Sequence, residues 1–265
     1  DRTQGTLPVV DLPGDCRLTL LSPDHDGLLY LKDRWKSELD RAHVKSGDVT
    51  ALRQKLAASR SLRPLGDVLG AADEAAFAAA GEHRFELPAD DDSDLDAGLE
   101  DALGRGSGEA GADAPFGGDA SAANGSSIAV LLEYPAAAPK VRLLLVGDAW
   151  PGVLETSITT LLGDPGKRLA VDAFKLPHHG SVANLSASLL EHLRCSHYLV
   201  STSGALFRHP HKRALDLILA HHAGPGRPTL HFNYLTRCTA PWSEQADQKN
   251  RGYRALHPKG TSLSF

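Results

Sequence analysis

Residues 141–149 read VRLLLVGDA, an apolar run that ends in Gly147 and Asp148. A short leucine- and valine-rich run is typical of a strand buried on both faces, and a glycine–aspartate pair directly after it indicates a turn. Residues 154–162 then carry apolar side chains at helical spacing. This stretch therefore predicts a strand, a turn and a helix in succession, as in α/β folds.

The same alternation continues on both sides of this stretch. Short apolar segments are separated by glycine- and proline-containing turns or by helical patterns. The further predicted strands are 16–22, 127–134, 169–176, 197–201 and 230–234, and the further predicted helices are 28–59 (broken at Gly47-Asp48), 66–80, 185–193 and 212–221. The alternation favours an α/β fold in which helices cover a sheet.

Residues 90–123 differ in composition from the rest of the chain. The segment begins with a run of aspartates, contains the single base Arg105, and continues with glycine and alanine. Such a segment cannot bury enough apolar surface to order itself, so we predict a flexible acidic insertion. The chain then divides into 1–89, 90–123 and 124–265.

Composition bounds the functional classes. The chain has 265 residues, 42% of them hydrophobic, and a net charge of −5, so no overall basic field favours nucleic acid or membranes. No apolar run is long enough for a membrane span, and three dispersed cysteines without a CxxC pair fit a reducing compartment, which predicts a cytoplasmic location. A start at Asp1 without any methionine predicts a piece of a longer product.

Polar residues follow several predicted strands. Asp148 follows 141–146, His178 and His179 follow 169–176, and His209 and His211 come after 197–201. Each residue alone is most often a turn, a helix cap or a solvated side chain. Together, imidazoles and a carboxylate at strand ends are the ligands that zinc, manganese or iron prefers. A nucleophile pair of Ser181 and His179 is the weaker reading, because no orienting acid is evident.

The motifs LLLVGDA (Leu143–Ala149), KLPHHGS (Lys175–Ser181) and HPH (His209–His211), preceded by NGSS (Asn124–Ser127), resemble the metallo-β-lactamase superfamily. The nearest branch is similar to the hydrolase domain of DNA-uptake competence proteins. The resemblance implies an αββα sandwich with two divalent ions, Zn²⁺ or Mn²⁺. In it, 1–89 would be the middle part of the domain and 124–265 its C-terminal half.

The resemblance also implies roles for individual residues. Asp148 would bridge the two metals, and one of His178 and His179 would be a metal ligand while the other supports it. His179 and His209 join Asp148 as catalytic candidates. The expected substrate contacts are Ser181, Arg208, His209 and His211.

One element of the family pattern is missing. The H-x-H-x-D-H string, which supplies most ligands of both metals, does not occur in this sequence. We therefore expect the N-terminal half of the domain, on a separate or cleaved chain, to complete the site and to bind tightly. The leading function is then a metal-dependent hydrolase acting on phosphodiesters, such as nucleic acid. The alternatives are a non-catalytic binding or regulatory module and, less favoured, a lactonase or other acyl hydrolase.

Overall fold

The computed structural model describes residues 5–58, 119, 121–202, 204 and 208–258. Its chain forms two compact units, a sheet unit (Asp1–Leu31 and Leu95–Phe265) and a second unit (Lys32–Asp94), which we call the helical unit after the helices in its described part. The predicted helix 66–80 and residues 90–118 of the predicted insertion lie outside the described residues.

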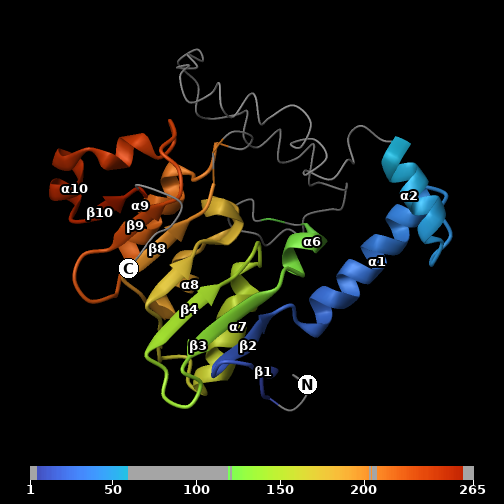
Figure 1. Ribbon diagram of the computed structural model, residues 1–265, viewed down its shortest axis with the longest axis horizontal. Coiled ribbons are helices and arrows are strands. Elements are labelled where there is room, and N and C mark those ends of the chain that lie inside the picture. Colours follow the sequence, from blue (N-terminus) through green and yellow to red (C-terminus); the bar gives the residue numbers. More distant parts are fainter. Residues whose placement is uncertain (1–4, 59–118, 120, 203, 205–207, 259–265) are drawn as a thin grey trace. The chain divides into compact units, whose positions relative to one another are not determined.

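The sheet unit is built on one mixed sheet of eight strands in the order β1-β2-β3-β4-β6-β8-β9-β10 (Figure 1). The first four strands pair antiparallel, and the pairs from β4 to β10 are parallel. The strands are β1 (Val9–Leu12), β2 (Cys16–Ser22), β3 (Ala129–Tyr134), β4 (Val141–Leu145), β6 (Ala173–Lys175), β8 (His197–Val200), β9 (Thr229–Phe232) and β10 (Arg254–Leu256). Sheet and helices together make the α/β fold that the sequence predicts.

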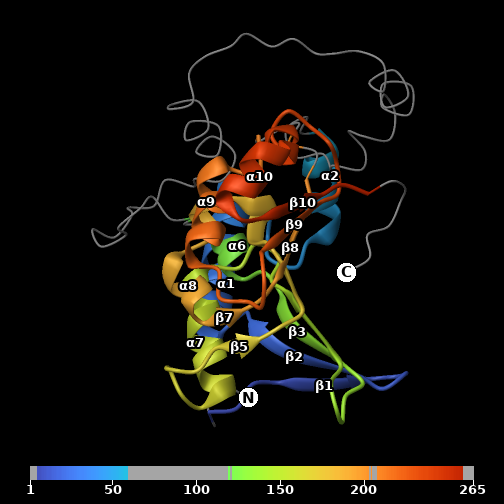
Figure 2. The ribbon, with the colours of Figure 1, turned by 90° about the vertical axis from the view of Figure 1, so that its left-hand side faces the viewer.

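Helices cover one face of this sheet, as Figure 2 shows for α7 (Pro151–Leu162), α8 (Ala187–Glu191) and α9 (Lys212–His221). Their buried side chains, such as Ile158, Leu189 and Ile218, form one core with sheet residues such as Leu144 and Phe174. The shorter helices are α6 (Ala122–Gly125), α10 (Gln245–Arg251) and the 3₁₀ turns η3 (Pro177–Gly180), η4 (Val182–Asn184) and η5 (Ala240–Ser243).

The opposite face of the sheet carries continuous cross-strand rows. One row runs Leu20, Val130, Leu145, Lys175, Leu199, His231 and Leu256, and the next runs Leu18, Leu132, Leu143, Ala173, His197, Thr229 and Arg254. The row members on β2, β3 and β4 are all leucine or valine, and all are only partly buried. We call these six side chains (Leu18, Leu20, Val130, Leu132, Leu143 and Leu145) the open face.

The helical unit contains most of α1 (His25–Arg41) and α2 (Val49–Ala58). Leu39 and Val44 are buried, and the Val44 backbone N–H donates to the Leu39 carbonyl where the chain leaves α1. Asp48 begins α2 by accepting the Ala51 N–H at 2.9 Å. The predicted break at Gly47-Asp48 is confirmed.

The main departure from the predicted elements lies within 169–176. This stretch forms two short strands, β5 (Leu169–Ala170) and β6, because Asp172 interrupts it. The Asp172 carboxylate accepts the Arg142 N–H at 2.7 Å, and its own N–H donates to the Arg142 carbonyl at 2.9 Å. β5 pairs instead with β7 (Leu193–Arg194) in a separate two-stranded sheet. Within the described residues, no helix has both the length and the apolar character needed to cross a membrane.

Candidate functional site

Two of the predicted polar clusters meet at one edge of the sheet. β4 and β6 are parallel neighbours, so the residues after their carboxyl ends lie side by side. Asp148 follows β4, and His178 and His179 follow β6. The His178 N–H donates to the Gly147 carbonyl at 3.0 Å, which joins the two turns directly.

The third cluster, His209–His211, packs against the second one. Gly180 has φ +90°, and a Cβ on it would come within 2.8 Å of the Pro210 Cβ. The His211 N–H donates to the Gly180 carbonyl at 3.1 Å, and His211 Nδ1 accepts the Val182 N–H at 3.1 Å. The HHGS and HPH motifs therefore form one packed unit.

The backbone at this edge is strained. His178 (φ 42°) and His179 (φ 58°) are both left-handed, a conformation that non-glycine residues rarely adopt. Each such residue costs on the order of 1–3 kcal/mol and persists only where its surroundings enforce it. Two consecutive histidines in this conformation mark the turn as a candidate functional site, and no sequence pattern indicates the strain.

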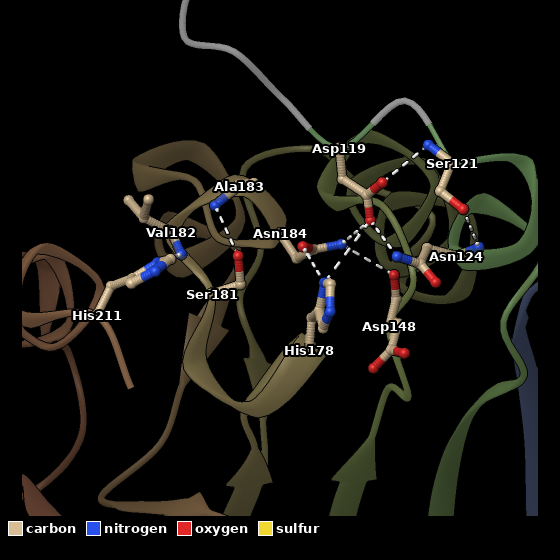
Figure 3. A network of polar contacts seen from close by, with 10 residues as sticks. All are labelled: Asp119, Ser121, Asn124, Asp148, His178, Ser181, Val182, Ala183, Asn184 and His211. Carbon is tan, nitrogen blue, oxygen red and sulfur yellow. Dashed lines mark hydrogen bonds and ion pairs between the residues drawn. The ribbon is translucent and has the colours of Figure 1, made fainter. Parts of the chain in front are cut away.

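A buried polar network supports His178 (Figure 3). The Asn184 side chain donates to Asp119 Oδ2 at 2.8 Å and to the Asp148 carbonyl oxygen at 3.0 Å, and its Oδ1 lies 2.9 Å from His178 Nδ1. Asp119 also accepts from Asn124 Nδ2 at 2.7 Å. The carboxylate of Asp148 points away from this network (Figure 3). Asp119 and Asn184 are functional candidates that sequence analysis missed, because neither belongs to a motif.

The predicted substrate contacts differ in their access to solvent. Ser181 and His209 are only 0% and 1% exposed, and the Ser181 hydroxyl accepts the Ala183 N–H at 3.3 Å as the cap of η4. The His209 ring lies edge-on to His178 and His211, with centroids 5.4 and 4.6 Å apart. Burial favours structural roles for Ser181 and His209. Arg208 is exposed.

Two further groups belong to the edge. The His179 Nδ1 donates to the Ser201 carbonyl at 2.5 Å, which ties the turn to the end of β8. Lys175, the last residue of β6, donates to the Leu176 carbonyl at 2.8 Å. Burial lowers the pKa of Lys175, while the nearby Asp148 carboxylate raises it. The net result is a lowered pKa for this part-buried amine, whose charge interacts with that of Asp148. Sequence analysis did not single out Lys175.

The fit of a metal to these residues is partial. The Asp148 carboxylate and the His178 imidazole are suitable donors, but no group of three or more histidine, cysteine, aspartate or glutamate side chains among the described residues has the arrangement of a metal site. By themselves these residues do not make a closed metal site, which needs three or four protein ligands.

Comparison of the chain with protein-family models, with curated proteins and with solved structures finds no match in any of the three. The functional conclusion therefore depends on the residues and geometry of the sheet edge.

Proposed function

We propose that this chain is part of a metal-dependent hydrolase of phosphodiesters, with a metallo-β-lactamase-like αββα domain as its complete form. The observation that carries the proposal is the junction of the GDA and HHGS turns, where Asn184 contacts both the Asp148 carbonyl and His178. A carboxylate and an imidazole held at adjacent carboxyl ends of parallel strands suit a site of this class.

In this proposal Asp148 and His178 are metal donors, and the remaining ligands come from an H-x-H-x-D-H segment on another chain or part of the protein. Zn²⁺ or Mn²⁺ bound there would supply a water that ionises near neutral pH. The chain's own residues hold the donors in place and offer Lys175 and Arg208 as cations for phosphate. The buried Ser181, His209 and the part-buried His211 shape the turn.

The open face supports a partner for this chain. Its side chains form an apolar patch across three strands, and contiguous exposed apolar surface marks interaction sites. A second sheet packed on it would bury this surface, and the burial would stabilise the complex by about 25 cal/mol per Å² of apolar area. We propose that the partner carrying the H-x-H-x-D-H string packs on the open face.

The test combines the chain with a co-purifying polypeptide that carries the H-x-H-x-D-H string. We expect the complex to bind Zn²⁺ or Mn²⁺ and to hydrolyse bis(p-nitrophenyl) phosphate, and Asp148→Ala to abolish hydrolysis. Asp164→Ala removes a carboxylate that accepts the Gly166 N–H in a turn outside the site motifs. It is the matched control and should retain activity. Unchanged hydrolysis in Asp148→Ala would contradict the proposal.

The alternative is a non-catalytic module that binds a partner. It is favoured by the same observation that limits the first proposal, the lack of a three-donor group among the described residues. A complex that forms on the open face but takes up no metal supports this alternative, whereas two metal ions per complex exclude it.

A further inference from the structure

We infer that Asp119 is a positioning residue that acts through Asn184 to fix His178 in one tautomer, with the proton on Nδ1 and a lone pair on Nε2. The inference deepens the proposed function, since it states which His178 atom serves the site. It concerns only side chains of this chain.

The orientation of the Asn184 amide follows from its neighbours. The Asp119 carboxylate and the Asp148 carbonyl can only accept hydrogen bonds, so the nitrogen of Asn184 must face both, at 2.8 and 3.0 Å. These two bonds use both amide hydrogens. The oxygen of Asn184 therefore faces His178.

The protonation of His178 follows from this orientation. Asn184 Oδ1 lies 2.9 Å from His178 Nδ1 and has no proton to give. His178 Nδ1 must therefore be the donor. In the neutral imidazole, the second nitrogen then carries a lone pair, which is the form that binds a metal or accepts a proton.

Hydrogen bonds from neighbouring residues hold the Asp119 carboxylate in place. Its side chain is 10% exposed and also accepts from Asn124 Nδ2 at 2.7 Å and from the Ser121 N–H at 2.8 Å. Asp119 Oδ2 lies 3.8 Å from His178 Nδ1, which is too far for a direct hydrogen bond. Asp119 therefore reaches His178 through Asn184, whose side chain is fully buried.

Burial makes the relay effective. Hydrogen bonds strengthen in a low-dielectric interior, and an unmatched buried amide is costly. Without Asp119, only the Asp148 carbonyl still accepts from the Asn184 amide, so the preference for the orientation with Oδ1 toward His178 is weaker. A rotated amide would offer its nitrogen to His178 and favour a proton on Nε2. The carboxylate thus strengthens the Nδ1–H form by holding the amide in its observed orientation.

The test reads the tautomer directly. Long-range ¹H–¹⁵N correlation spectra of the metal-free chain, at a pH where His178 is neutral, distinguish the two forms. We expect the Nδ1–H form in the wild type. In Asp119→Ala and in Asn184→Ala, the ratio of the Nδ1–H to the Nε2–H form should fall about tenfold, the effect of losing one net hydrogen bond.

Two controls isolate the relay. Asp119→Asn keeps an oxygen that can accept from Asn184, and should restore the Nδ1–H form. Asp164→Ala removes a carboxylate that accepts the Gly166 N–H in an exposed turn, and should leave the His178 signals unchanged.

The outcomes separate this inference from the proposed function. An Nε2–H form in the wild type overturns it, as does a persistent Nδ1–H form in whichever of Asp119→Ala and Asn184→Ala is folded. Because the spectra need neither metal nor substrate, a failure of hydrolysis leaves this result standing. If the complex hydrolyses its substrate while His178 carries its proton on Nε2, the relay is wrong and the proposed function is unaffected.

Discussion

At the scale of residues, the candidate site is defined by an unusual run of left-handed backbone. His178, His179 and Gly180 all have positive φ. Only the glycine adopts such a conformation without a steric cost. The two histidines are held there by contacts from other elements, His178 by Asn184 and His179 by the Ser201 carbonyl. The strain is therefore balanced by specific hydrogen bonds.

Gly180→Ala tests how tightly the HHGS and HPH motifs pack. The new Cβ would lie 2.8 Å from the Pro210 Cβ and would also be forced into positive φ. We expect a loss of about 3 kcal/mol in the free energy of unfolding, measured by urea denaturation. Gly226→Ala is the matched control, because Gly226 has φ +73° with open space around it. Gly226→Ala should lower the free energy of unfolding by about 1 kcal/mol. Equal losses in the two variants would argue against close packing at Gly180.

The lowered pKa of His231 predicts how the free energy of unfolding depends on pH. Burial and the neighbouring His197 lower the pKa of His231 to about 4. The unfolded chain, with an ordinary histidine pKa of about 6.5, binds more protons than the folded chain between those values. The free energy of unfolding should therefore fall as the pH falls from about 6.5 to about 4.

His231→Gln isolates this contribution in urea unfolding at pH 7, 6 and 5. The variant should lose less stability over this range than the wild type does. A residual slope is expected from His257, whose pKa burial also lowers. Equal pH slopes for variant and wild type would show that His231 does not drive the effect.

At the scale of elements, Ser186 links two helices of the covered face. Its hydroxyl accepts the Leu189 N–H at 2.9 Å as the N-cap of α8 and donates to Glu155 of α7 at 2.8 Å. Ser186→Ala should lower the free energy of unfolding by about 1 kcal/mol or somewhat more. Ser188→Ala removes an exposed hydrogen bond to Glu155 at 3.0 Å. It should lower the free energy of unfolding by only a few tenths of a kcal/mol. A similar loss in both variants would contradict the capping role.

Strongly patterned elements could be predicted from the sequence. The strand at 16–22 and the helix at 212–221 have the predicted bounds, because alternation and helical periodicity directly reflect burial of one face. Short elements such as β1, α10 and β10 were missed. β1 and β10 have only four and three residues, too few to show a period, and are defined by pairing with β2 and β9. The seven residues of α10 include a single apolar side chain, an alanine, so they show no helical periodicity.

The site was predictable in part for the same reason. Asp148 and His178 follow apolar strands, and parallel pairing brings them together. Asp119 follows no predicted strand and lies at the end of an acidic stretch. Its role depends mainly on the contact with Asn184, which is 65 residues away along the chain and in none of the quoted motifs. The lowered pKa of Lys175 likewise results from its burial in the folded chain. Propensity and spacing carry no information on such contacts.

At the scale of the whole sheet, the two faces differ in how they are filled. Helices of this chain supply the core on one face, from Ile158 on α7 to Ile218 on α9. The open face has leucines and valines at the corresponding depth of the sheet but leaves them partly exposed. The sheet therefore has one completed interface and one that suits a second layer.

This difference has a consequence for assembly. Because the covered face already provides a core, a partner would dock onto a formed sheet and not fold together with it. Docking of that kind makes apparent stability a function of partner concentration through mass action. A cell that makes more of this chain than of the proposed partner would then hold an excess of the less stable, uncomplexed chain. If the proposed complex forms, the open face would link the amount of the partner to the lifetime of this chain.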